Sequence, residues 1–84
     1  MKNFLVEAEI MPKRGVNDPQ GEAVLSGLRL LGFEAASKVR VGKLIRFQVA
    51  AETSDEARAN ATSMCEKLLA NPVIEEFELE VSEA

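Results

Sequence analysis

Histidine, tryptophan and tyrosine are absent from this chain of 84 residues, and cysteine occurs only once. Without histidine, proton transfer at neutral pH would fall to carboxylates, lysines or the single thiol. Without tryptophan and tyrosine, the chain lacks the usual side chains that stack on nucleic-acid bases, and its net charge of −4 argues against a general affinity for nucleic acid. The composition therefore points away from nucleic-acid binding and offers no obvious catalytic group.

Two further absences concern the compartment and metal chemistry. The lone Cys65 cannot form an internal disulfide, which fits a reducing cytoplasm. The longest apolar runs span only a few residues and the N-terminus lacks a signal-peptide core, so we expect neither export nor a membrane span. No CxxC motif or other ligand cluster occurs, so no metal site is predicted.

The amino-acid composition is otherwise typical of one soluble globular domain, which we expect to span residues 1–84. Hydrophobic residues make up 46% of the chain and charged residues 29%, without the charge excess of a disordered protein. So small a domain has a modest stability margin, which oligomerisation would raise. The basic residues are concentrated centrally, since residues 38–51 carry four basic and no acidic side chains, whereas residues 52–84 carry nine acidic and two basic ones.

The first part of the chain predicts a strand followed by a helix. Between Lys2 and Met11, side chains alternate with the period of a strand that has one buried side. A helix over Pro19–Leu31 is indicated by apolar residues at helical spacing, and Gly32 can end it in the left-handed conformation. Phe33 is then placed to fold back on the last turn, as in a Schellman motif. The apolar positions of this helix are Val24, Leu25, Leu28 and Leu31.

Two strands, over Glu34–Val41 and Lys43–Ala51, are expected next, with Gly42 in the turn between them. A two-residue loop would place Val39 and Val41 on the polar face of the hairpin. A three-residue loop over Gly42–Leu44 places these valines on the same face as the apolar residues that follow the turn. We favour the three-residue loop. The same register gathers polar side chains on the other face of the hairpin, namely Lys38, Arg40, Arg46 and Gln48.

The last part of the chain predicts a second helix and a final strand. Thr53 and Glu56 form a capping box, in which the threonine caps the helix and the glutamate lies three positions on. Asn71 and Pro72 end this helix. The alternation of apolar side chains with glutamates over Val73–Val81 then predicts a last strand with an acidic outer edge.

The order of elements, with right-handed crossovers, predicts an α+β ferredoxin-like two-layer sandwich (βαββαβ), a four-stranded antiparallel sheet with two helices on one face. The other face of the sheet would stay open. It mixes apolar with charged side chains, which makes it a natural oligomer surface. The residues expected there are Leu5, Glu7, Glu9, Arg40, Leu44, Arg46 and Ile74.

The loop before the first helix is the best candidate for a binding site. Asp18 suits a helix N-cap, because Pro19 disfavours the α region for the residue before it and is itself favoured at the first helical position. Two cations, Lys13 and Arg14, precede Gly15 beside this helix start, where an anion could bind. The spacing of a P-loop is missing, and a solvated basic turn is the other interpretation.

Three other features have both a functional and a structural interpretation. Cys65 could be a nucleophile, but it lies on the apolar stripe of its helix, where cysteine usually behaves as a small buried hydrophobe, and we predict a core residue. The basic segment Lys38–Arg46 could bind an anion or be neutralised by Glu7 and Glu9 on a neighbouring strand, and we favour the neutralisation. The run Glu75–Glu80 is expected to be a solvated strand face or pairing edge rather than a metal site.

Four blocks of sequence stand out in a fixed order: Pro12–Gly21 (PKRGVNDPQG), Leu31–Phe33 (LGF), Val39–Lys43 (VRVGK) and Cys65–Glu75 (CEKLLANPVIE). Together they cover much of the chain and resemble the PurS subunit family of phosphoribosylformylglycinamidine synthase. The chain departs from that pattern at Asn17, where a leucine is common, and in the proline that precedes Lys13.

The resemblance implies a step of purine synthesis in which formylglycinamide ribonucleotide, glutamine and ATP give formylglycinamidine ribonucleotide, glutamate, ADP and phosphate. In that family PurQ is the glutaminase and PurL the synthetase that binds ATP and the ribonucleotide. PurS is a small non-catalytic subunit, a homodimer or a dimer of dimers, that assembles the two and helps ammonia pass between them. No catalytic residue and no cofactor are thus implied for this chain, and ATP and Mg would be used by the synthetase.

We expect the partner subunits or a bound anion to dock on the loop before the first helix and on a second patch around the turn of the hairpin. The residues concerned are Lys13, Arg14, Gly15, Asp18, Pro19, Gln20, Gly21, Arg40, Gly42 and Lys43.

Two other functional classes remain open. A ferredoxin-like regulatory domain would use a loop and helix start such as residues 15–21 to sense a small ligand. An acylphosphatase-like enzyme would need an arginine and an asparagine about a phosphate-binding loop, and no glycine-rich arginine loop of that kind follows the first strand.

Overall fold

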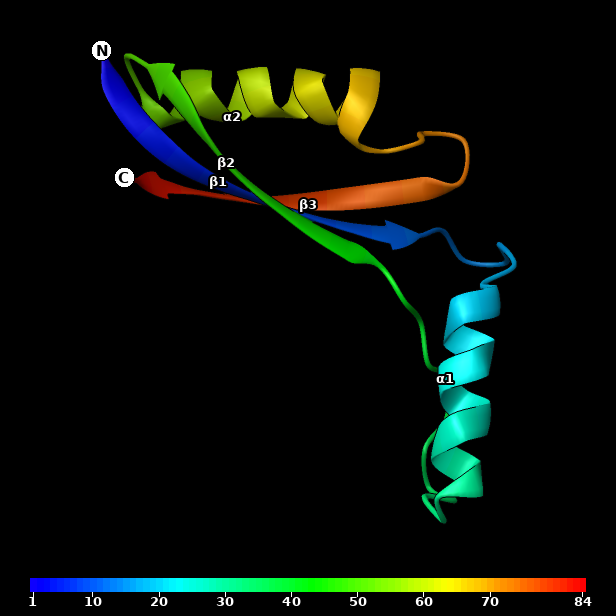
Figure 1. The fold of residues 1–84 in the computed structure, drawn as a ribbon. Helices are drawn as coiled ribbons and strands as arrows, with labels where there is room; N and C mark the ends of the chain where they lie inside the picture. Colours follow the sequence, from blue (N-terminus) through cyan, green and yellow to red (C-terminus); the bar gives the residue numbers. More distant parts are fainter.

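The computed structural model describes residues 1–84 as a three-stranded antiparallel sheet with two helices. The strands are β1 (Lys2–Pro12), β2 (Lys43–Ala51) and β3 (Glu75–Glu83), in the order β2-β1-β3. The helices are α1 (Pro19–Leu30) and α2 (Ser54–Met64), and a π-helical turn, η1 (Cys65–Leu69), continues α2. Figure 1 shows α2 lying along the sheet and α1 projecting away from it. No helix is long and apolar enough to cross a membrane.

The core lies between α2 and one face of the sheet. The register pairs Val6 of β1 with Phe47 of β2 and with Val81 of β3, so core-facing side chains form rows across the three strands. The helix side of the core is built from small side chains, which let α2 approach the sheet closely. The buried apolar residues are Phe4, Val6, Ala8, Ile10, Val49, Ala51, Ala57, Ala61, Cys65 and Ala70.

The local signals that begin α2 and end α1 are confirmed. Thr53 Oγ1 accepts a hydrogen bond from the Glu56 backbone N–H at 3.1 Å, as the capping box requires. After α1, Gly32 has a φ of +94°, and the Phe33 N–H donates to the Leu28 carbonyl at 3.0 Å. This is the Schellman arrangement, so short-range sequence patterns set both helix ends.

The strand predicted over Glu34–Val41 is wrong, and with it the four-stranded sheet and the hairpin at Gly42. Lys38 has a φ of +55°, a left-handed conformation that a strand residue does not adopt. The Val41 N–H donates to the carboxylate of Asp18 rather than to a neighbouring strand. The segment therefore returns alongside α1 and enters β2 directly (Figure 1).

The prediction of two helices on one face is also wrong for the single chain, because only α2 covers the sheet (Figure 1). The opposite face is open, as predicted. The Arg46 guanidinium donates to the Glu7 carboxylate there, which confirms one of the expected neutralising contacts. Two residues expected on this face, Arg40 and Ile74, lie outside the strands. Those that do lie on it include Leu5, Glu7, Glu9, Leu44 and Arg46.

Candidate functional site

A hollow of about 450 Å³ lies where the loop between β1 and α1 meets the segment that returns from α1. Residues 12–18 line it on one side and residues 38–40 on the other. Its charged residues are four cations and two carboxylates, Lys13, Arg14, Lys38, Arg40, Asp18 and Glu22. The hollow therefore has an excess of positive charge.

The four cations of this basic hollow are not engaged in ion pairs. The ion pairs of the chain join Lys2 to Glu83 and Arg46 to Glu7, both on the sheet. The positive charge of the basic hollow is thus available to an anion or to an acidic surface of another protein.

Asp18 fixes the shape of the basic hollow. Its Oδ1 accepts from the Gly21 N–H at 3.0 Å, which caps α1 as predicted, and its Oδ2 accepts from the Val41 N–H at 2.9 Å. The hydrogen bond from Val41, then that from Gly21, and to a smaller extent the charge of Arg40, lower the pKa of Asp18, although partial burial opposes them. Asp18 is consequently an ionised structural tie between the two walls.

Two glycines permit close backbone approaches, Gly21 at the basic hollow and Gly42 where the returning segment meets β1. A Cβ on Gly21 would lie 2.6 Å from the Val39 carbonyl oxygen and would also meet the Asp18 carboxylate. A Cβ on Gly42 would meet the backbone carbonyl of Ile10. These positions therefore require glycine for reasons of space.

A third segment, residues 70–75, is hydrogen-bonded to the loop between β1 and α1. The Lys13 N–H donates to the Ile74 carbonyl at 2.9 Å, and the Lys13 ammonium donates to the Pro72 carbonyl at 2.6 Å. The turn is itself closed by Asn71, whose side-chain oxygen accepts from the Val73 N–H at 3.1 Å. Lys13 is therefore partly a structural residue, and the turn leaves Val73 78% exposed beside it.

The structure brings together some of the predicted site residues and separates others. The residues Lys13, Arg14, Gly15, Asp18 and Arg40 line the basic hollow. The first residues of α1, Pro19, Gln20 and Gly21, adjoin it, whereas Gly42 and Lys43 lie at the entry to β2 and do not line it.

Sequence reasoning missed Lys38 and Glu22 as members of the site. Lys38 was assigned to a strand face, and its place in the densest basic segment of the chain was the signal that could have identified it. No comparable signal distinguished Glu22 from other glutamates in the first turn of a helix.

The single thiol lies elsewhere. Cys65 is fully buried between helix and sheet, which confirms that it is a core residue. Burial, and next the charge of Glu66, raise the pKa of the Cys65 thiol, so that the reactive thiolate is disfavoured.

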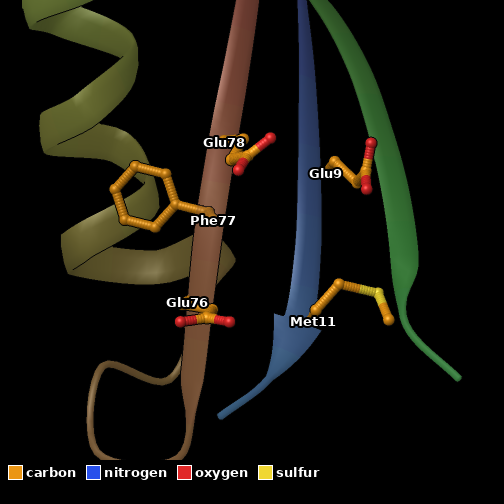
Figure 2. Close-up of a pocket in the computed structure, with 5 residues that line it drawn as sticks. All are labelled: Glu9, Met11, Glu76, Phe77 and Glu78. Atoms are coloured by element: carbon orange, nitrogen blue, oxygen red, sulfur yellow. The ribbon is translucent and has the colours of Figure 1, made fainter. Parts of the chain in front are cut away.

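The open face of the sheet has a different character from the basic hollow. A smaller hollow of about 210 Å³ lies there. Among its lining residues, Figure 2 shows Phe77 directed to the helix side of β3, while Glu78 extends over β3 towards β1. Glu9 is paired with Glu78 across the strands, and Met11 with Glu76. These like charges and the exposure of the β3 glutamates confirm a solvated strand face.

Comparisons with known proteins point to one family. The family model of PurS, phosphoribosylformylglycinamidine (FGAM) synthase, matches residues 5–83. The FGAM synthase subunit PurS of Archaeoglobus fulgidus is 45% identical over 76 residues, which are 90% of this chain and 95% of that protein. The PurS subunit of Bacillus subtilis is 38% identical over 81 residues, 95% of this chain and 94% of that protein.

Solved structures agree with these matches. The crystal structure of Methanocaldococcus jannaschii PurS has a TM-score of 0.85 at 32% identity, covering 96% of this chain and 98% of its own. A chain in the structure of PurLQS from Thermotoga maritima has a TM-score of 0.83 at 36% identity and covers 100% of both chains. None of these comparisons supports the ligand-sensing alternative.

Proposed function

The chain belongs to the PurS family, and from this premise we propose that it is the non-catalytic assembly subunit of an FGAM synthase in purine biosynthesis. Its relatives are PurS subunits of that enzyme, and one structure that it resembles is a PurLQS complex. A PurL-type synthetase and a PurQ-type glutaminase are therefore its partners. The ATP- and glutamine-dependent chemistry would then be carried out by the partners, with ATP and Mg bound by the synthetase.

The chain's own residues fit a supporting role. The only thiol is buried with a raised pKa, and the chain contains no histidine. The best-defined surface feature, the basic hollow, is a binding surface rather than a set of catalytic groups. Its lining includes no cysteine, serine, threonine or histidine, the usual nucleophiles and general bases.

The proposed docking site rests on one observation. The basic hollow holds four cations that have no ion-pair partners, and hydrogen bonds within the chain hold its walls in place. The Asp18 bonds to Gly21 and Val41 and the Lys13 bonds to Pro72 and Ile74 order both walls before any partner arrives. A pre-ordered surface loses little conformational entropy on binding, so its charge can be used for partner recognition. We place an acidic surface of a partner subunit over the basic hollow.

The test is a pull-down of both partners with Arg14→Glu/Arg40→Glu. The matched control, Lys2→Glu/Lys67→Glu, makes the same change in net charge outside the basic hollow. We expect the first variant to lose complex formation at low salt, while the control assembles like wild type. Wild-type assembly of Arg14→Glu/Arg40→Glu at low salt, with a normal thermal melt, would exclude the basic hollow as the docking site.

A further inference from the structure

β3 is an edge strand, because β1 pairs with it on one side and no strand pairs with it on the other. Its nine residues make it longer than the usual strand of about five or six. Edge strands are normally protected against pairing with another chain by a proline, a bulge or a covering element. β3 contains no proline, and its register with β1 runs without a bulge up to Glu83. Its outer side, which we call the free edge of β3, is therefore open to a further strand.

The backbone groups on the free edge can be assigned from the register. The Lys13 N–H donates to the Ile74 carbonyl at one end of the ladder, and the Ala84 N–H donates to the Asn3 carbonyl at the other end. Both pairs continue the register of β1 with β3, in which bonded and non-bonded pairs alternate. The even-numbered residues of β3 therefore bond to β1, and the N–H and C=O groups of the odd-numbered residues point to the free edge. Within the strand these residues are Phe77, Leu79 and Val81.

One acceptor on the free edge is already used by a cation. The Arg58 guanidinium of α2 donates to the Leu79 carbonyl at 3.2 Å, which agrees with the outward direction of this carbonyl. A hollow of about 340 Å³ adjoins this position and is lined by Arg58 and residues 79–82, among others. The free edge thus combines outward backbone groups with space beside them, and it already accepts one cationic donor.

The side chains of β3 define the chemistry of a strand that could add here. On the helix side, Phe77, Leu79 and Val81 pack against the core but remain half-exposed, because no neighbouring strand covers their outer flank. On the open face, three exposed glutamates have no ion-pair partner. They are Glu76, Glu78 and Glu80. An added strand that matches both faces has apolar side chains beside the half-exposed ones and basic side chains beside the glutamates.

We propose that the free edge of β3 binds an extended segment of another protein in which lysine or arginine alternates with apolar residues. The segment extends the sheet by one strand, through backbone hydrogen bonds to Phe77, Leu79 and Val81. Arg58 gives up its bond to Leu79 when the segment arrives. This site is separate from the basic hollow, and the inference does not depend on the proposed function.

The charges exclude a second copy of this chain as the occupant. Pairing of β3 with another β3 would place glutamates opposite glutamates on the open face, which is destabilising. β2 of a second copy offers only one cation, Arg46, on that face. A basic segment of a different protein is therefore the occupant that the free edge fits.

The test uses the isolated chain and two blocked peptides of about eight residues, one alternating lysine with valine and the other glutamate with valine. In the free chain, the amides of Phe77, Leu79 and Val81 should exchange rapidly with solvent, whereas those of Glu78 and Glu80 should be protected by β1. The lysine peptide should slow exchange of the first three amides at least about tenfold, because each gains a strand hydrogen bond. The glutamate peptide should leave all five amides unchanged.

A modified peptide separates strand addition from simple adsorption of a cation. A lysine peptide with N-methylated backbone amides keeps its charge but cannot form the ladder, so it should protect none of the three outward amides. Glu78→Lys/Glu80→Lys should reverse the preference and bind the glutamate peptide. The matched control, Glu34→Lys/Glu66→Lys, makes the same change in net charge away from β3 and should behave like wild type.

The peptide comparison on wild type needs no variant, so it holds even if a double variant fails to fold. Protection of the outward amides without any peptide would show that the edge is already occupied and would overturn the proposal. Equal protection by the lysine peptide and its N-methylated form would also overturn it. So would an absence of protection by the lysine peptide up to about millimolar concentration, the range of weak complexes.

Discussion

Asp18 and Val41 are 23 positions apart, yet the Val41 N–H donates to Asp18 Oδ2 at 2.9 Å while Oδ1 caps α1. One carboxylate thus joins the beginning to the end of residues 19–42, the arm formed by α1 and the segment that returns along it. The Val41 amide therefore donates to the start of α1 and not to a neighbouring strand.

Replacement of Asp18 by asparagine should loosen the arm. Asparagine remains a good N-cap, but it has one acceptor oxygen, so either Gly21 or Val41 loses its hydrogen-bond acceptor. We expect faster amide exchange at Val41 and a lower thermal midpoint than wild type. Asp55→Asn, in the first turn of α2, is the matched control and should change neither the amide exchange at Val41 nor the thermal midpoint. Equal effects of the two substitutions would contradict the role of Asp18 in joining the two ends of the arm.

The Asp18 tie should also depend on pH in a defined direction. The pKa of Asp18 is lowered in the folded protein from its ordinary value of 3.8. Its contribution to stability is therefore fully present above pH 3.8 and is lost as the pH falls through the folded-state pKa. The stability difference between wild type and Asp18→Asn, measured by urea unfolding, should be constant near neutral pH and narrow in acid. A difference that does not change with pH would show that the charge of Asp18 is unimportant.

Two substitutions in α1 should change the free energy of unfolding in opposite directions. Gly21→Ala forces a methyl group against the Val39 carbonyl and the Asp18 carboxylate, which should cost about 1–3 kcal/mol of unfolding free energy. Ser26→Ala, on the exposed face of α1, should stabilise by about 0.5 kcal/mol through helix propensity alone. Denaturant melts of both variants test this, and a neutral or stabilising Gly21→Ala would contradict the close approach of the walls.

Cys65 should matter for packing and not for chemistry. Cys65→Ala should lower stability by about 1 kcal/mol and Cys65→Ser by about 1–3 kcal/mol, because the serine buries a hydroxyl without an assured partner. Both variants, once folded, should support glutamine-dependent synthesis in the reconstituted complex. A loss of activity by several orders of magnitude in folded Cys65→Ala would return this thiol to the list of catalytic candidates. The native thiol should also react slowly with a thiol reagent until the chain unfolds.

The parts of the fold that follow from short-range physics could be predicted. The strand alternation, the cap at Thr53, the stop at Gly32 and the core position of Cys65 each depend on residues within a turn or two. The predicted four-stranded sheet was wrong because residues 34–41 return along α1, where Val41 bonds to a residue 23 positions away. No pattern within residues 34–41 reveals that bond.

The site was predictable to a similar extent. Lys13, Arg14, Gly15 and Asp18 were identified from the loop sequence, because proline, glycine and charge at a helix start are local signals. Lys38 was missed because it was assigned to a strand face, whereas its backbone is left-handed. The structural role of Lys13 was missed because the carbonyl that accepts its hydrogen bond belongs to Pro72, 59 positions away.

The central claim is that this chain is a required but non-catalytic subunit. The most direct test measures glutamine-dependent FGAM formation by purified PurL-type and PurQ-type partners, with and without the chain. We expect no activity from the chain alone, full activity when wild type is added to both partners, and little when Arg14→Glu/Arg40→Glu replaces it. Full glutamine-dependent activity of the two partners without the chain would contradict the account.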